Sequence, residues 1–226
     1  MTQLRRLGRR QSDAAVDRLL GGLPALLGPD AAFPAELFHD YRTRVRAAFT
    51  VPDSSITPMM ARLLFGLAMH GRPRTVWALG SYFGNALVWL TAPHLLLGVP
   101  GRATAVDVDP HATAHAAANF ARLGAGSVRC LAADALTCPI DERGIDLLFI
   151  DVDEPVRRKA RYTDCLQRFL PHLAPGALVA AHDVGEPVFE HDMDRYRRLV
   201  RDHPRIAATA SLLVDPFGVE VSRVAS

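Results

Sequence analysis

Acidic residues stand at the ends of several apolar runs in this sequence. Asp107 ends "ATAVD", Asp134 follows "VRCLAA", and Asp151 and Asp153 follow "DLLFI". A carboxylate at the end of a buried strand loses several kcal/mol of hydration unless it is paired or ligated, so it marks a functional site more often than a plain turn. Such carboxylates can accept hydrogen bonds from a sugar or a base, or they can ligate a cation.

A glycine-bearing loop precedes these residues. In the segment "TVWALGSYFGNA" an apolar run ends in Gly80 and continues through Ser81, Tyr82 and Phe83 to Gly84. Glycine lets the backbone approach a ligand closely. The spacing lacks the Gly-x-Gly-x-x-Gly that places a pyrophosphate on a helix N-terminus, which disfavours NAD and FAD. Alone, the loop fits a cofactor site and a structural turn equally well.

Short apolar runs alternate with helical patterns from about residue 57 onward, and they predict the elements that position these residues. We expect strands over 75–80, 103–107, 128–132, 146–151, 177–183, 206–215 and 219–224, with helices over 57–70, 84–97, 110–124, 155–171 and 187–202. Runs that are apolar throughout are typical of strands buried on both faces of a parallel sheet. We therefore predict an α/β fold with a doubly wound, Rossmann-like, mostly parallel sheet of seven strands and helices on both faces. The short "PFG" connection predicts an antiparallel C-terminal hairpin.

In such a sheet the carboxyl ends of the strands meet at one edge, where ligands bind. Asp107 follows the glycine loop at an offset where an acidic residue can accept hydrogen bonds from both ribose hydroxyls. Asp134 can accept from the exocyclic amine of adenine, or it can cap the segment that follows, and both interpretations remain open.

Composition limits the classes of protein to consider. The chain has 226 residues, 49% hydrophobic and 22% charged, which suits one domain with a substantial core. A net charge of +2, without a basic stripe interleaved with aromatics, gives no reason to expect nucleic-acid binding. No apolar run approaches the roughly 18 residues of a membrane span. The three cysteines form no Cys-x-x-Cys, so a reduced, cytoplasmic setting is expected.

The N-terminal part of the chain is less regular. It contains two candidate helices, over 13–27 and 34–49. We expect residues 1–55 to form a helical extension that covers the mouth of the site or makes a dimer contact, and residues 56–226 to form the main domain. A homodimer is one possibility that this leaves open.

The order of these features resembles the class I S-adenosylmethionine (SAM) dependent methyltransferases. The glycine loop, the acid after the second strand, the Asp after the third and the acidic pair after the fourth all come in that family's order. The closer resemblance is to the small bacterial catechol and caffeoyl-CoA type O-methyltransferases, over about 54–224. It includes "KARYTDCLQRFLPHLAPGALVA" and the closing "DPFGVEVSRV".

The resemblance implies a SAM site at the edge of the sheet. The implied cofactor-binding residues are Gly80, Ser81, Tyr82, Gly84, Asn85, Asp107, Val108, Asp134, Ala135 and Asp151. The family ends its first strand in Glu-x-Gly and commonly has a small hydroxyl residue after the second glycine, whereas this chain has Ala78 and Ala86. Two lost polar contacts would weaken binding about 10- to 10⁴-fold unless Ser81, Asn85 or the Tyr82 hydroxyl replaces them.

The resemblance also implies a divalent metal. Its ligands would be Asp151, His182 and Asp183, the last two standing where the family has an Asp-Asn pair. Oxygen ligands suit Mg²⁺, and the histidine shifts the preference toward Mn²⁺, Fe²⁺ or Zn²⁺. The alternative is that Asp183 caps a turn and His182 is a satisfied residue of the pocket.

Three residues are candidates for the base that removes a proton from the acceptor. His182 and Asp153 are favoured, since a group with a pKa near 7 close to the acceptor oxygen suits proton removal. Lys159 is displaced from the family's lysine position by an apparent insertion of "EPVRR", so a solvated helix position is favoured over catalysis.

These observations predict a SAM-dependent methyltransferase that acts on a hydroxyl of a phenolic or natural-product small molecule. Two alternatives remain. The altered cofactor loop could serve another use of SAM, such as cyclisation or aminocarboxypropyl transfer, or the chain could be a catalytically degenerate partner subunit.

Overall fold

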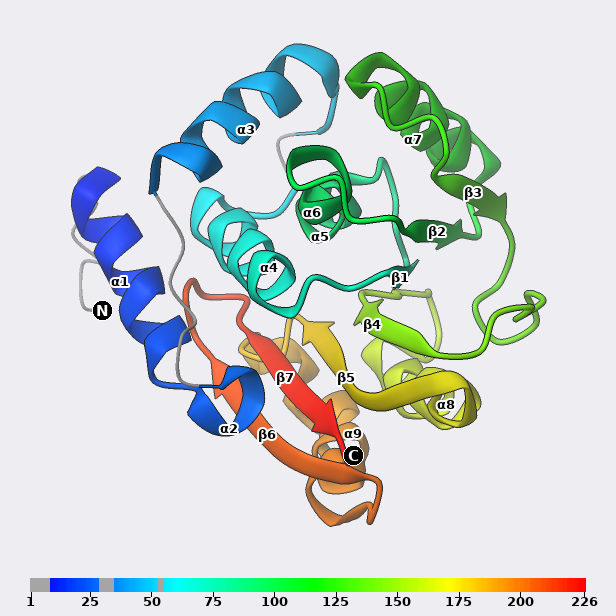
Figure 1. Ribbon diagram of the computed structural model, residues 1–226. Coiled ribbons are helices and arrows are strands. Elements are labelled where there is room, and N and C mark those ends of the chain that lie inside the picture. The colour runs from blue at the N-terminus through cyan, green and yellow to red at the C-terminus, as the bar shows by residue number, and fades with distance from the viewer. Residues whose placement is uncertain (1–8, 29–34, 53–54) are drawn as a thin grey trace.

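A seven-stranded sheet lies at the centre of the protein, with helices packed on both of its faces (Figure 1). The computed structural model describes residues 9–28, 35–52 and 55–226. The strands are β1 (Thr75–Leu79), β2 (Arg102–Asp107), β3 (Arg129–Ala132), β4 (Ile145–Ile150), β5 (Leu173–His182), β6 (Ile206–Leu212) and β7 (Val219–Val224).

The helices are α1 (Arg9–Gly21), α2 (Pro24–Leu27), α3 (Ala35–Ala48), α4 (Pro58–Gly71), α5 (Asn85–Leu90), α6 (Ala92–Leu96), α7 (Pro110–Leu123), α8 (Arg161–Phe169) and α9 (Glu190–Asp202). Three short 3-10 turns complete them: η1 (Arg158–Ala160), η2 (Leu170–His172) and η3 (Pro187–Phe189). None of the described helices is both long and apolar enough to cross a membrane.

The strand order is β3-β2-β1-β4-β5-β7-β6. Strands β1 to β5 pair in parallel, and β7 runs antiparallel to both of its neighbours, β5 and β6. The predicted α/β fold, its seven mostly parallel strands and the antiparallel hairpin are therefore confirmed. Strands β2 and β3 follow β1 toward one edge of the sheet, whereas β4 and the later strands lie toward the other edge. The strand order therefore reverses between β1 and β4, and ligands bind at this kind of switch point in doubly wound sheets.

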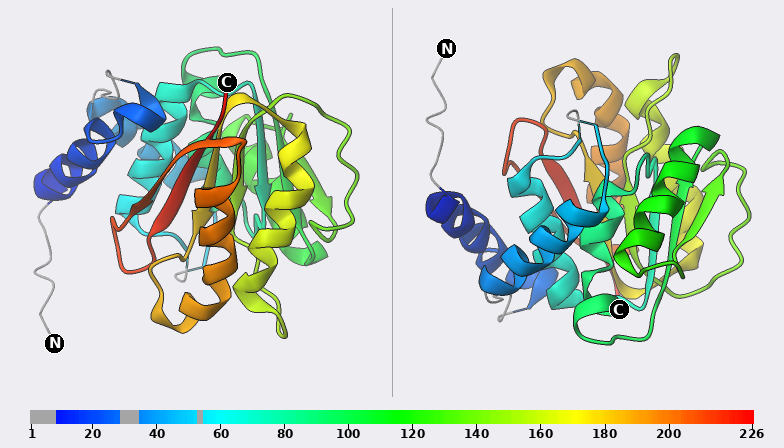
Figure 2. Two further views of the ribbon diagram at one scale, coloured as in Figure 1. Left: turned by 90° about the horizontal axis from the view of Figure 1, so that it is seen from below. Right: turned by 90° about the horizontal axis from the view of Figure 1, so that it is seen from above.

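The sheet has a separate apolar core on each face because successive strand residues point to opposite sides. Val76 and Ala78 of β1 pack with the helices α1 to α7 on one face. Trp77 and Leu79 pack with α8 and α9 on the other, and Figure 2 shows these two helices together on their side of the sheet. Complete burial on both sides explains why the strand sequences are apolar throughout.

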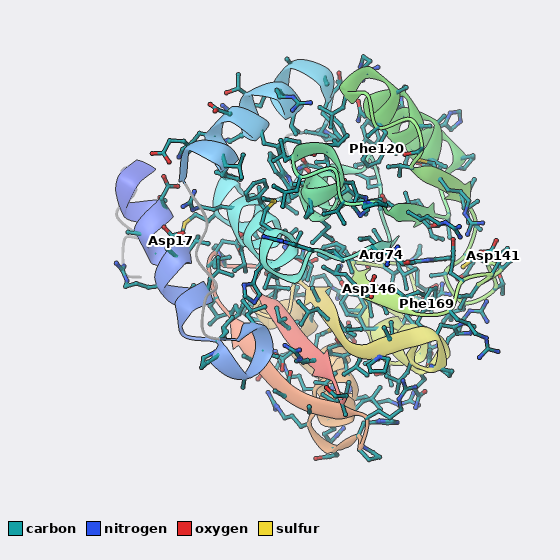
Figure 3. The ribbon with its side chains drawn as sticks, viewed as in Figure 1. Asp17, Arg74, Phe120, Asp141, Asp146 and Phe169 are labelled. Atoms are coloured by element: carbon teal, nitrogen blue, oxygen red, sulfur yellow. The ribbon has the colours of Figure 1, made fainter. Side chains whose placement is uncertain are left out.

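Hydrogen bonds from two backbone amides fix the central strands at their amino ends. The carboxylate of Asp146 in β4 accepts from the backbone N–H of Arg74 at 2.8 Å and of Thr75 at 2.9 Å (Figure 3). This contact holds β1 and β4 in register, so that their carboxyl ends deliver the glycine loop and Asp151 side by side.

Local sequence signals set the ends of the main helices. Thr57 caps α4 by accepting from the Met60 N–H, with Pro58 in the first turn. Asp109 caps α7, and Gly124 ends that helix in the left-handed conformation that favours glycine. These boundaries agree with those expected from the sequence.

Three expected helices are interrupted in the structure, two of them beside a proline and one after a residue in the left-handed conformation. The helix expected over 84–97 is divided into α5 and α6 next to Pro93, which lacks an amide hydrogen. The one expected over 155–171 starts only after Arg158, whose φ of +46° is left-handed. The one expected over 13–27 is interrupted before Pro24.

The helices α1 to α3 pack into the core of the sheet's first face. Arg62 of α4 is almost fully buried and pairs with Asp17 of α1 at 2.9 Å, while its guanidinium lies 5.3 Å from the centre of the Phe38 ring of α3. At the other end, Asn119 of α7 bonds to the backbone of Thr50. The N-terminal helices are thus anchored by specific polar contacts as well as by apolar packing.

The three cysteines are free thiols, and burial is expected to make them unreactive. Burial raises the pKa of Cys130 to about 11 and that of Cys165 to about 12, and it also raises the pKa of Cys138. At pH 8 only about a thousandth of a thiol with a pKa near 11 is thiolate.

We expect the native protein to react with a disulfide reagent at least tenfold more slowly than free cysteine, and three thiols to react in denaturant. Fast modification of any thiol in the native protein would contradict this.

Candidate active site

Two adjoining cavities lie at the carboxyl ends of the parallel strands. The larger has a volume of about 510 Å³ and is bounded by the segments that follow β1, β2, β3 and β4. The smaller, of about 200 Å³, lies beside the glycine loop and the end of β5. Gly80, Tyr82 and Asp151 border both. A cavity of several hundred Å³ at a switch point suits a small-molecule ligand.

Packing against the protein itself explains both glycines of the loop. A Cβ at Gly80 would lie 2.1 Å from the backbone oxygen of Asp151, and one at Gly84 would lie 2.7 Å from the ring of Phe120 on α7 (Figure 3). Both residues also have left-handed φ angles, +73° and +85°. The glycines therefore let the loop pass close to the end of β4 and to α7. Sequence reasoning alone leaves a cofactor site and a structural turn equally open for this loop.

Asp107 at the end of β2 holds the glycine loop in place. One carboxylate oxygen accepts from the backbone N–H of Tyr82 at 2.7 Å, and the other accepts from the N–H of Asp109 at 3.0 Å. Tyr82 has a left-handed φ of +47°, so this bond stabilises a conformation that non-glycine residues seldom adopt. Each carboxylate oxygen can accept more than one hydrogen bond, so Asp107 can still receive two ribose hydroxyls.

Asp134 is held by a neighbouring arginine. Arg161 donates to its two carboxylate oxygens at 2.6 and 2.8 Å, and the backbone N–H of Leu136 donates to it at 2.8 Å. The hydrogen bond from Arg161 lowers the pKa of Asp134 below its usual value. The capping role that the sequence offered is therefore present. Both Asp134 and Arg161 border the larger cavity, which leaves the carboxylate able to meet a ligand.

Asp151 is the centre of a buried cluster of charges. Its Oδ1 accepts from the Lys159 ammonium at 2.8 Å and from the Tyr162 hydroxyl at 3.1 Å, and its Oδ2 lies 3.2 Å from Nδ1 of His182. The Lys159 ammonium also lies 2.8 Å from Oδ2 of Asp183. Segments around β4, η1, α8 and β5 thus meet at one carboxylate.

The charges of this cluster support each other. Burial opposes ionisation of Asp151, but Lys159 and His182 more than offset it and lower its pKa. Burial likewise disfavours the cationic forms of Lys159 and His182, yet the carboxylates of Asp151 and Asp183 outweigh it and raise the pKa of both. For Asp183, burial and the nearby Asp151 raise the pKa.

Lys159 corrects one expectation. The sequence favoured a solvated helix position, whereas the side chain is only 3% exposed and lies within the cluster. The left-handed turn at Arg158 places it in η1 ahead of α8, and its ammonium lies 5.3 Å from the ring centres of both Tyr162 and Phe189. One signal was present in the sequence, since Lys159 is the only lysine of the chain.

The smaller cavity contains polar atoms without partners. The hydroxyl of Ser81 and Nε2 of His182 are buried, and neither has a hydrogen-bond partner among the described residues. Both side chains line this cavity, together with Asn85, Asp183 and Phe217. A buried polar atom without a partner is costly, so these two atoms are candidate contacts for a ligand.

The structure brings most of the predicted site residues together. The predicted residues that border one or both cavities are Gly80, Ser81, Tyr82, Asn85, Asp107, Val108, Asp134, Asp151, His182 and Asp183, whereas Gly84 borders neither. Asp153 borders only the larger cavity, away from His182, and Ala135 is buried in the core. Ligand atoms of Asp151, His182 and Asp183 lie within 4.8 Å of one another, as a metal site would require. Sequence reasoning missed Tyr162 and Arg161, although both fall within the "KARY" stretch.

Comparison with known proteins places these features in a family context. Residues 78–184 match the model of a methyltransferase domain family. No curated protein sequence matches the chain.

Solved structures share its fold. An O-methyltransferase from Bacillus cereus in complex with S-adenosylhomocysteine is 17% identical, with a TM-score of 0.63 over 94% of this chain and 97% of that one. The O-methyltransferase TomG from Streptomyces achromogenes, involved in tomaymycin synthesis and solved with SAM, is 18% identical, with a TM-score of 0.62 over 97% and 100%. A methyltransferase from Podospora anserina, bound to S-adenosylhomocysteine, is 14% identical, with a TM-score of 0.64 over the full length of both chains. The Rossmann-like methyltransferase fold and the resemblance to class I SAM-dependent methyltransferases are confirmed.

Removing the carboxylate of Asp107 tests the larger cavity as the nucleoside site. An Asp107→Ala variant loses the acceptor for the ribose and the bond to the Tyr82 N–H, so we expect the Kd for SAM to rise roughly 10- to 100-fold in calorimetric titration. Asp141→Ala is the matched control, because it removes a carboxylate that borders neither cavity. Equal SAM affinity in wild type and Asp107→Ala would refute the assignment.

Proposed function

We propose that this chain binds SAM in the larger cavity and transfers its methyl group to a hydroxyl of a small-molecule acceptor, phenolic or natural-product in type, in the smaller one. The observation that carries the proposal is the pair of adjoining cavities, with the carboxylate of Asp107 in one and the free Nε2 of His182 in the other. Gly80, Tyr82 and Asp151 lie at their junction, where the reacting groups would meet.

The methionine end of the cofactor would be held differently from the family pattern. Ala78 is fully buried in the core and Ala86 nearly so, and neither offers a polar group. Of the three replacements that the sequence suggested, Asn85 already donates to the Ser55 hydroxyl, and the Tyr82 side chain is exposed to solvent. Ser81 keeps an unpartnered hydroxyl that borders the smaller cavity, next to Gly80 and Tyr82 at the junction, so the methionine end of SAM would extend from the larger cavity toward the smaller one. We therefore assign the methionine end to Ser81.

His182 is the base of the proposed reaction. An ionised carboxylate only accepts hydrogen bonds, so Asp151 holds the proton of the imidazole on Nδ1, at 3.2 Å. In the neutral imidazole Nε2 then carries a lone pair, and it faces no partner among the described residues. This is the arrangement that a general base needs, with one nitrogen oriented by a carboxylate and the other free for the acceptor proton.

Beyond this base, the chemical step requires mainly that the protein aligns the two reactants. SAM supplies a methyl group on a sulfonium sulfur. The neutral thioether that remains when the carbon–sulfur bond breaks is a good leaving group. The acceptor oxygen forms the new bond to the methyl carbon as the carbon–sulfur bond breaks, and its proton passes to Nε2 of His182. The chain contributes alignment of acceptor and methyl group in the two cavities, which is where most of the rate enhancement of such a displacement arises.

Replacing His182 tests the base. We expect His182→Gln to lower kcat about 10²- to 10⁴-fold on a catechol or phenolic substrate, because no base then remains to take the proton of the substrate hydroxyl. The Kd for SAM should stay within about threefold, since His182 does not line the larger cavity. His191→Gln is the matched control, an exposed histidine on α9.

The products separate the proposal from its rivals. Methyl transfer leaves S-adenosylhomocysteine, which chromatography with mass spectrometry detects together with the methylated acceptor. Methylthioadenosine as the product would instead support cyclisation or aminocarboxypropyl transfer. SAM binding without any product from a broad acceptor panel would support the degenerate partner subunit.

A further inference from the structure

The ammonium of Lys159 lies at the place where a divalent cation would have to bind. The candidate ligands Asp151 and Asp183 can share one cation only if it lies between their carboxylates. In the structure Lys159 Nζ bridges them, at 2.8 Å from Oδ1 of Asp151 and 2.8 Å from Oδ2 of Asp183. A metal ion bound to the same two oxygens at the roughly 2.1 Å typical of Mg²⁺ would contact the ammonium directly.

Three further candidate ligand atoms are also engaged, and of the ligand atoms of these three residues only Nε2 of His182 is without a partner among the described residues. The second oxygen of Asp151 faces Nδ1 of His182 at 3.2 Å, and the same nitrogen lies 3.1 Å from Oδ1 of Asp183. The Tyr162 hydroxyl donates to Asp151 as well. The donor set has the composition of a metal site, but its oxygens are already paired with protons that this chain provides. With Lys159 in place, the site does not fit a divalent ion.

Lys159 is built into this position. Its side chain is 3% exposed, and its ammonium lies near the rings of Tyr162 and Phe189. Leaving the cluster would deprive two largely buried carboxylates of their cation and would take the ammonium away from the rings of Tyr162 and Phe189. An ion pair of this kind that loses one partner is destabilised, so departure of the ammonium is costly.

We infer that Lys159 replaces the divalent cation, and that the site works without a metal. As a positioning residue, its single charge offsets one of the two carboxylate charges and keeps Asp151 ionised and aimed at His182. The statement that turnover needs no metal rests on the proposed function, whereas the statement that the site binds no divalent ion does not.

Metal titration of the wild-type protein is the first test. We expect no Mn²⁺ binding tighter than millimolar by electron paramagnetic resonance or calorimetry, in the absence of SAM and acceptor. A stoichiometric site of micromolar affinity would overturn the inference, whether or not the protein is later found to transfer methyl groups. Methylation in the presence of a chelator should equal that without it, and loss of at least 90% of the activity would likewise overturn the inference.

A gain of function gives the second test. Lys159→Met keeps a side chain of similar length between the two rings but removes the charge, so the paired carboxylates lose their cation. We expect this variant to bind one Mn²⁺ at least tenfold more tightly than wild type, and Asp151→Asn in the same background to abolish the gain. A merely structural role for the lysine would not create a metal site.

Arg157→Met is the matched control, because it removes an exposed positive charge two residues away and should leave Mn²⁺ binding unchanged. A folded Lys159→Met protein, verified by circular dichroism, that gains no Mn²⁺ binding would overturn the inference. If this variant does not fold, the wild-type titration still decides the question.

Discussion

The organisation of the site depends on keeping one carboxylate ionised inside the protein. Asp151 ends a strand that is apolar on both faces, where an unpaired charge would be too costly to retain. Lys159, Tyr162 and His182 supply the hydrogen bonds that keep it there, and each comes from a different element. Because removal of any one would deprive this carboxylate of a hydrogen bond or a countercharge, the cluster ties η1, α8 and β5 to the end of β4.

The same strand end connects the charge cluster to the cofactor loop. The loop passes so close to the backbone of Asp151 that only glycine fits at position 80, and Asp107 fixes its far side through the Tyr82 N–H. The two cavities are therefore not independent. A change that shifts the end of β4 moves the wall of the proposed nucleoside site as well as the carboxylate that orients His182.

The sequence predicted the sheet well and the charge cluster only in part. Wholly apolar runs and clear helix caps define β1, β4, α4 and α7, and parallel strands necessarily bring Asp107, Asp151 and His182 to one edge. The position of Lys159 depends on a left-handed residue, Arg158, inside a stretch with a helical pattern, and no local pattern announces such a turn. The break at Pro93 was readable in principle, since proline disfavours a continuous helix. The partner of Asp134 was not, because Arg161 is distant in sequence and meets it only through the fold.

A fixed ammonium and a bound metal ion would both offset the negative charge of the Asp151 and Asp183 carboxylates, but in different ways. A metal ion neutralises the carboxylates with two charges and offers an open coordination position to the acceptor, but it must be recruited from solution. Lys159 brings one charge and is always present, and its position is set by the shape of η1 and by the two rings beside it. With less positive charge to stabilise an acceptor oxyanion, proton removal depends more on a base. The free Nε2 of His182, oriented by the carboxylate that Lys159 keeps ionised, is therefore the expected counterpart of a site without a metal.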